Sequence, residues 1–116
     1  MFIQLKHKEL DVYRTVRKLV RETYKVSLLL PSEEKFNMMQ QIRRAAVSVK
    51  LNLAEGSTRK SEAERKRFFE VARGSVVEID AALETAVDLN YFAVNELETL
   101  GQLLNKSFAM LTRMIG

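Results

Sequence analysis

The side chains of this sequence that could do chemistry are mainly cations, and they suit contact with phosphate groups. Between Gln41 and Glu78 nine Lys and Arg residues stand against five Asp and Glu, and another basic stripe lies near the N-terminus. Non-specific affinity for nucleic acid grows with the number of phosphates that such cations neutralise. The candidate nucleic-acid-binding residues are Arg14, Arg17, Lys18, Arg21, Arg43, Arg44, Lys50, Arg59, Lys60, Lys66 and Arg67.

Part of this basic set has an ordinary explanation as surface charge. Lys66, for example, can pair with Glu70 one helical turn away. Aromatic residues are not interleaved with the cations along the sequence, so stacking of single-stranded bases has little support. We therefore expect contact with the nucleic-acid backbone and weak sequence specificity.

A polar stripe accompanies the cations. At about 100° per residue, Gln41, Ser48, Asn52 and Glu55 share one side of a helix, beside its apolar seam. This stripe is either a solvated face or a hydrogen-bonding contact with a neighbouring helix or subunit, and Glu55 could instead pair with Arg59 or fix the turn. We favour the contact because Ser and Asn are poor helix formers. The candidate oligomer-interface residues are Gln41, Ser48, Asn52, Glu55, Gly74, Ser75 and Glu78.

Catalytic and metal-binding groups are scarce. His7 is the single histidine, cysteine is absent, and no histidine stands near Ser57 or Ser61 to activate a hydroxyl group. The Glu-x-x-His pairs of di-iron bundles and the Gly-rich phosphate loops are both missing. We expect no enzymatic activity, no cofactor and no bound metal.

Apolar periodicity predicts the elements that must position these residues. Four helices are expected, from Lys8 to Leu29, from Glu33 to Glu55, from Ser61 to Asn90 and from Asn95 onward. The last helix should bury the seam Leu97, Leu100, Leu104, Phe108, Leu111 and Ile115. Short connections favour antiparallel neighbours, so residues 1–116 are expected to form one all-α, up-down-up-down four-helix bundle.

Particular residues predict where the helices begin and end. Pro31 should stop the first helix, and Ser32 should cap the second. Gly56 is expected as the residue that follows the second helix, and Ser61 with Glu64 as the capping box of the third. Gly74 with Ser75 is explained either by packing inside the bundle or by a close helix contact at a subunit boundary.

Charge is segregated along the chain. Residues 1–50 hold eleven Lys and Arg against five Asp and Glu, whereas residues 78–105 hold six acids and no Lys or Arg. Such segregation fits an anionic ligand on one face and equally a head-to-tail contact between copies. No segment resembles a signal peptide or approaches the ~18–20 apolar residues of a membrane span, so a cytoplasmic location is expected.

Several strings resemble a known family. They are Gln41-Ile42-Arg43-Arg44-Ala45-Ala46, Asn52-Leu53-Ala54-Glu55-Gly56, Ala72-Arg73-Gly74-Ser75 and Asp88-Leu89-Asn90-Tyr91. The chain resembles the small bacterial four-helix bundles called 23S rRNA intervening-sequence proteins, or S23 ribosomal proteins. The likeness covers nearly the whole chain. The family is similar to the accessory variability determinant of diversity-generating retroelements, a basic homopentamer that binds nucleic acid and reverse transcriptase.

The resemblance implies a ring-like homo-oligomer, with a pentamer favoured, that binds RNA or DNA and performs no catalysis. One departure is that Lys50-Leu51 occupy the place of a Pro-containing pair, which should leave the second helix straight. The alternative is a scaffold that binds a protein partner, such as a reverse transcriptase, without touching nucleic acid. A lone bundle whose charges only confer solubility is the third possibility.

Overall fold

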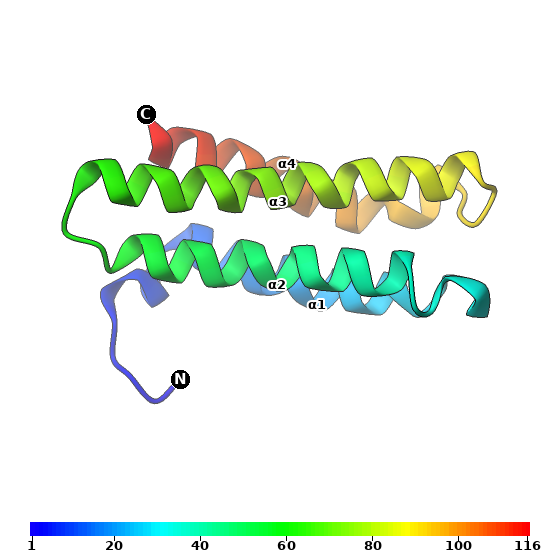
Figure 1. Cartoon of the computed structure of the whole chain (residues 1–116), viewed down its shortest axis with the longest axis horizontal. Coiled ribbons are helices and arrows are strands. Elements are labelled where there is room, and N and C mark those ends of the chain that lie inside the picture. The colour runs from blue at the N-terminus through cyan, green and yellow to red at the C-terminus, as the bar shows by residue number, and fades with distance from the viewer.

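Apolar residues that recur every three or four positions fold this chain into four α-helices. The computed structural model describes residues 1–116, with α1 (Asp11–Ser27), α2 (Met38–Ser57), α3 (Glu62–Asp88) and α4 (Glu98–Ile115). Figure 1 shows α1 and α2 in one layer and α3 and α4 in the other, with successive helices antiparallel. Each helix packs mainly against two neighbours, so α1–α2, α2–α3, α3–α4 and α4–α1 close a ring of contacts. The predicted all-α, up-down-up-down bundle is confirmed.

The core forms where apolar residues recur at helical spacing on each helix. Ile42, Ala46, Val49 and Leu53 of α2 are fully or almost fully buried, and Val16 and Leu19 of α1 lie opposite the same core. Leu100, Leu104 and Leu111 complete it from α4. Phe108 was expected in this seam, but 42% of it is exposed because it lies over the α3–α4 groove, with its ring 5.6 Å from the Arg73 guanidinium.

The connection between α1 and α2 differs from the prediction. Ser32 does not cap α2; it begins a short 3-10 helix, η2 (Ser32–Glu34), and the N-cap residue of α2 is Asn37. The α-helix begins at Met38, whose N–H donates to Glu34 Oε1 at 3.4 Å. The Asn37 side chain donates to the same oxygen at 3.1 Å. The Glu34 carboxylate therefore accepts a backbone N–H at the start of α2, where the positive end of the helix dipole favours a negative charge.

The turn between α2 and α3 confirms one expectation and corrects another. Ser61 caps α3 by accepting the Glu64 N–H at 3.3 Å. Gly56, however, lies inside α2 and is buried, so it does not act as a residue that follows the helix. A Cβ atom there would come within 2.8 Å of Phe68 Cβ and of Phe69 Cε1. Gly56 is needed because the aromatic start of α3 packs directly on the α2 backbone.

Two other elements complete the fold. The N-terminal 3-10 helix η1 (Lys6–Glu9) precedes α1, where a continuous helix from Lys8 was expected, and η3 (Val94–Leu97) precedes α4. The Tyr91 hydroxyl donates to Glu34 Oε2 at 2.8 Å. This hydrogen bond joins the connection between α3 and α4 to the connection between α1 and α2. None of the helices combines the length and the apolar character that crossing a membrane requires.

Candidate nucleic-acid interface

The layer of α1 and α2 gathers six of the predicted cations on one face. Arg14, Lys18 and Arg21 follow one another at helical spacing on the outer side of α1, and Arg17 lies beside them. Together these four side chains are the whole lining of a shallow depression of about 170 Å³. Arg43 and Lys50 are two turns apart on the side of α2 that faces α1. We call this surface, formed by Arg14, Arg17, Lys18, Arg21, Arg43 and Lys50, the basic face.

Two tyrosines of α1 lie between the cations of the basic face. The Arg43 guanidinium is 4.8 Å from the centre of the Tyr24 ring, and Lys50 Nζ is 5.9 Å from the centre of Tyr13. Aromatic rings that are not interleaved with the cations along the sequence therefore lie against two of them in the fold. Residues far apart in the sequence meet because α1 and α2 are antiparallel neighbours. The spacing of Tyr13 and Tyr24 beside the basic stripe was the signal available for this pairing.

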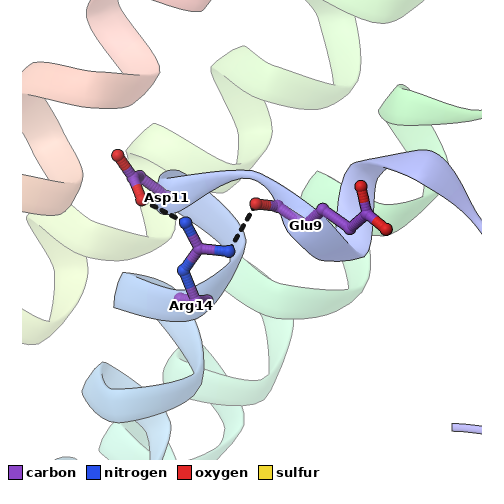
Figure 2. Close-up of polar contacts among 3 residues, drawn as sticks. All are labelled: Glu9, Asp11 and Arg14. Atoms are coloured by element: carbon purple, nitrogen blue, oxygen red, sulfur yellow. Dashed lines mark hydrogen bonds and ion pairs between the residues drawn. The ribbon is translucent and has the colours of Figure 1, made fainter.

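Few cations of the basic face are neutralised inside the chain. Figure 2 shows Arg14 donating to the Asp11 carboxylate and to the Glu9 carbonyl oxygen, where η1 meets the first turn of α1. The chain has two other ion pairs, Arg59 with Glu55 at 2.6 Å and Lys66 with Glu62 at 3.7 Å, and both lie off this face. Five of its six cations therefore have no carboxylate partner within the chain.

The remaining predicted cations do not belong to the basic face. Arg59 pairs with Glu55, and its guanidinium lies 5.0 Å from the centre of the Phe68 ring, at the α2–α3 turn with Lys60. Lys66 and Arg67 are on α3, in the opposite layer, and Arg44 is exposed on α2, away from the side that meets Tyr24. The predicted set of eleven is thus split among several surfaces, since its members come from three helices and a turn.

The polar stripe makes hydrogen bonds inside the chain. Ser75 donates to Ser48 Oγ at 2.9 Å, across the contact between α2 and α3, and the Asn52 amide donates to the Ser48 hydroxyl and carbonyl oxygens at 3.0 and 2.9 Å. The predicted hydrogen bond to a neighbouring helix is therefore confirmed for Ser48. Glu55 makes its predicted pair with Arg59.

Other residues predicted for an oligomer interface remain accessible. Gln41 and Glu78 line a cavity of about 220 Å³ between α2 and α3. Gly74 is exposed, and a Cβ atom there would meet nothing within 4 Å, so close packing within the bundle does not explain this glycine. Contact of these residues with a second copy stays a prediction.

A groove of opposite charge lies between α3 and α4. These two helices form the other layer of the bundle (Figure 1). It has a volume of about 430 Å³, with Leu83, Val87 and Leu97 among its apolar residues. Its carboxylates are Asp80, Glu84, Asp88 and Glu98, and none of them forms an ion pair within the chain. We call this surface the acidic groove.

Two titratable groups are perturbed near these surfaces. His7 is buried at the end of the basic face, where its ring meets the Tyr13 ring edge-on at 5.1 Å. Burial lowers the pKa of His7, and the nearby charge of Lys8 lowers it further. The hydrogen bond to Glu34 raises the pKa of Tyr91, and desolvation adds to this shift. Nowhere do three His, Asp or Glu side chains gather as a metal site would need.

Comparisons with known proteins concern the whole bundle. A family model described as 23S rRNA-intervening sequence protein matches residues 8–113. The chain is also similar to a crystal structure of a protein with unknown function from the S23 ribosomal protein family, from Bacteroides thetaiotaomicron. Identity is 21%, the TM-score is 0.82, and the alignment covers 90% of this chain and 97% of that one, which shows a shared fold. No curated protein matches the chain.

Proposed function

Because the chain belongs to the family of 23S rRNA-intervening sequence proteins, we propose that it is a non-enzymatic, homo-oligomeric bundle whose basic face binds RNA or DNA. The observation that supports this proposal is a face of six cations of which only Arg14 has a carboxylate partner. Such a face attracts a polyanion and releases its counterions, which drives binding without reading the sequence. A cytoplasmic location is part of the proposal.

Self-association is the second part of the proposal. The basic face lies on α1 and α2 and the acidic groove on α3 and α4, which are different layers of the bundle (Figure 1). No ion pair joins the two surfaces within one copy. A head-to-tail contact would bring the acidic groove of one copy to cations of the next that lie off the basic face, such as Arg44 and Arg67. Repetition of that contact closes a ring when the rotation between copies permits it, and a pentamer is favoured. A ring would also repeat the basic face and increase avidity.

A titration of fluorescence anisotropy with structured RNA and with duplex DNA, at several salt concentrations, tests nucleic-acid binding. We expect the logarithm of the binding constant to fall steeply with the logarithm of salt concentration. The double reversal Arg17→Glu with Arg21→Glu should lower affinity by more than about tenfold and flatten the salt dependence.

A matched reversal, Lys106→Glu with Arg113→Glu, makes the same change in net charge at exposed residues of α4. It should leave affinity within about threefold of the wild type, because those residues lie off the basic face. Equal losses in the two double variants would mean that net charge and not this face governs binding. If the wild-type chain binds neither RNA nor DNA at low salt, the proposed nucleic-acid binding is wrong.

The acidic groove favours a second candidate, a scaffold that binds a basic segment of a protein partner without touching nucleic acid. A reverse transcriptase is one such partner. Apolar side chains at the centre and carboxylates at the edge resemble the core and rim of protein interfaces. The salt titration separates the two candidates, because a scaffold of this kind would retain neither RNA nor DNA. Wild-type mass by light scattering, run beside the titration, measures the assembly.

A further inference from the structure

Arg43 differs from every other cation of the basic face in how it is held. Its Nε–H donates to the Ser27 hydroxyl at 2.8 Å, and its guanidinium lies over the Tyr24 ring at 4.8 Å. Ser27 is completely buried in α1 and donates in turn to the Tyr24 carbonyl oxygen at 2.6 Å. Arg43 is therefore fixed by a hydrogen bond at one edge and by an aromatic ring on one side.

The other edge of the Arg43 guanidinium is unused. Its two terminal nitrogens donate to no group in the chain, no carboxylate lies within ion-pair distance, and neither nitrogen is buried. By contrast, Arg59 is also stacked on an aromatic ring, but its terminal nitrogen is already paired with Glu55. Arg14 donates to Asp11 in the same way. Arg43 thus combines a fixed orientation with a free pair of parallel N–H donors.

Such a free edge suits one phosphate group. Guanidinium binds phosphate oxygens through two parallel hydrogen bonds, and a fixed guanidinium loses less side-chain entropy when it does so. Arg21 lies one turn before Tyr24 on α1, so the line of unpaired cations on α1 leads toward Arg43. Their spacing along the α1 axis, about 4.5–6 Å, suits a linear polyanion.

We infer that Arg43, held by Ser27 and Tyr24, is the phosphate-binding residue of the basic face. Both of its terminal nitrogens donate hydrogen bonds to one phosphodiester group. Arg17, Lys18 and Arg21 then supply attraction without a fixed geometry. Ser27 and Tyr24 are positioning residues, since they act through Arg43. The inference rests on the proposed nucleic-acid binding and adds to it a defined contact.

Paired Arg→Lys variants test this inference, because each keeps the charge and removes the planar donors. Arg43→Lys should weaken binding of structured RNA by about fivefold to tenfold with an unchanged salt slope. Arg21→Lys, the matched control on the same face, should change affinity by less than about twofold. Arg43→Ala should weaken binding further and reduce the salt slope by about one.

Variants of the positioning residues separate binding from folding. Ser27→Ala keeps the Arg43 charge but removes its buried acceptor, and it should weaken binding by about twofold to fivefold. Tyr24→Phe keeps the ring and should bind as the wild type does. Unfolding temperatures are measured for each variant. If the Ser27–Arg43 hydrogen bond only stabilises the fold, Ser27→Ala should lower the unfolding temperature and leave the affinity of the folded protein unchanged. That result would overturn the inference.

Nitrogen-15 NMR of the arginine side chains in the wild-type chain supplies a direct readout. Addition of RNA should shift and sharpen the terminal N–H signals of Arg43 more than those of Arg21. Poly-glutamate serves as a carboxylate comparator, and equal effects on Arg43 would assign the residue to an acidic protein surface instead. If Arg43→Lys and Arg21→Lys bind RNA equally, the inference is wrong while the proposed function stands. If the wild-type chain binds no nucleic acid, both are wrong.

Discussion

The basic face and the acidic groove are built on the same plan, two antiparallel helices side by side, yet they hold their charges differently. On the basic face, Tyr13 and Tyr24 lie against Lys50 and Arg43, so aromatic rings and cations share the surface. In the acidic groove, carboxylates surround apolar side chains at a depression of about 430 Å³. The first surface suits a ligand of dense negative charge, and the second suits a basic segment with apolar side chains.

All three ion pairs of the chain are local. The positive charge of the basic face and the negative charge of the acidic groove are therefore not neutralised by each other. Each joins residues three or four positions apart, and none crosses from one helix to another. Exposed ion pairs of this kind contribute only about 0–1 kcal/mol, so the bundle does not depend on charge for its stability. The charges of the two surfaces are left available for partners.

The largest expected effect comes from reversing the acidic groove. For the proposed head-to-tail assembly, Glu84→Lys with Asp88→Lys should yield single copies, because the groove would then repel the cations of the next copy. Light scattering after size-exclusion chromatography measures the mass. Affinity for RNA should fall only to that of one copy, since the basic face is unchanged.

Glu33→Lys with Glu70→Lys is the control for the groove reversal, because it makes the same charge change at two exposed acids outside the groove. It should leave the mass of the assembly unaltered. An unaltered mass for the groove variant as well would show that the groove is not the subunit contact. Dissociation by Arg17→Glu with Arg21→Glu would instead identify the basic face as its partner.

The next largest effect concerns the α2–α3 contact, which fixes the position of one layer relative to the other. Gly56→Ala would place a Cβ atom 2.8 Å from Phe68 Cβ and from Phe69 Cε1, so α2 and α3 must move apart. We expect a loss of about 1–3 kcal/mol in the free energy of unfolding, measured by urea denaturation. An unchanged midpoint would show that the two aromatic residues repack without cost.

A smaller effect of opposite sign is expected at Gly74, on the exposed side of α3. Gly74→Ala meets nothing within 4 Å, so it should raise the free energy of unfolding by about 0.5–1 kcal/mol through the gain in helix propensity. Urea denaturation of a single copy, made with the groove reversal in place, isolates this gain. If the variant in the wild-type background also loses mass, Gly74 belongs to a subunit contact.

The smallest expected effect is a pH dependence confined to one end of the basic face. The pKa of His7 is below its usual value of 6.5 because of burial, so the unfolded chain binds a proton more readily than the folded chain. Its contribution to stability should be complete above about pH 6.5 and decline as pH falls through the lower folded pKa.

Hydrogen exchange at η1 and the start of α1, measured at about pH 7.5 and about pH 5.5, follows this loss. Protection there should fall at the lower pH, while protection in α3 beside the acidic groove stays the same. His7→Gln should remove the difference between the two conditions. A fall in protection that persists in the variant would assign the pH effect to another group.

Local sequence signals predicted much of the fold. The four amphipathic helices and the Ser61 cap lie as expected, because each depends on residues within a turn or two of one another. Where a distant residue intervenes, local signals failed. Glu34, and not Ser32, accepts the backbone N–H at the start of α2. Phe68 and Phe69 explain why Gly56 lies inside α2 and not after it.

In the candidate site too, local sequence signals predicted some features and missed others. The basic stripe of α1 followed from periodicity, and so did the polar residues that α2 presents to α3. Periodicity could not show that Arg59 is neutralised by Glu55 at the end of α2 while Arg43 is not. It also gave no reason to select Ser27, which lies 16 positions before Arg43.

The sequence by itself determined that this chain forms four amphipathic helices with cations concentrated early and acids late. These properties follow from composition and from spacing along a helix, which short-range interactions control. Only the tertiary structure decided which cations share a surface and which of them is held in place. Arg43 is fixed by a buried hydroxyl of another helix, and that contact exists only because packing of the apolar seams brings α1 and α2 together.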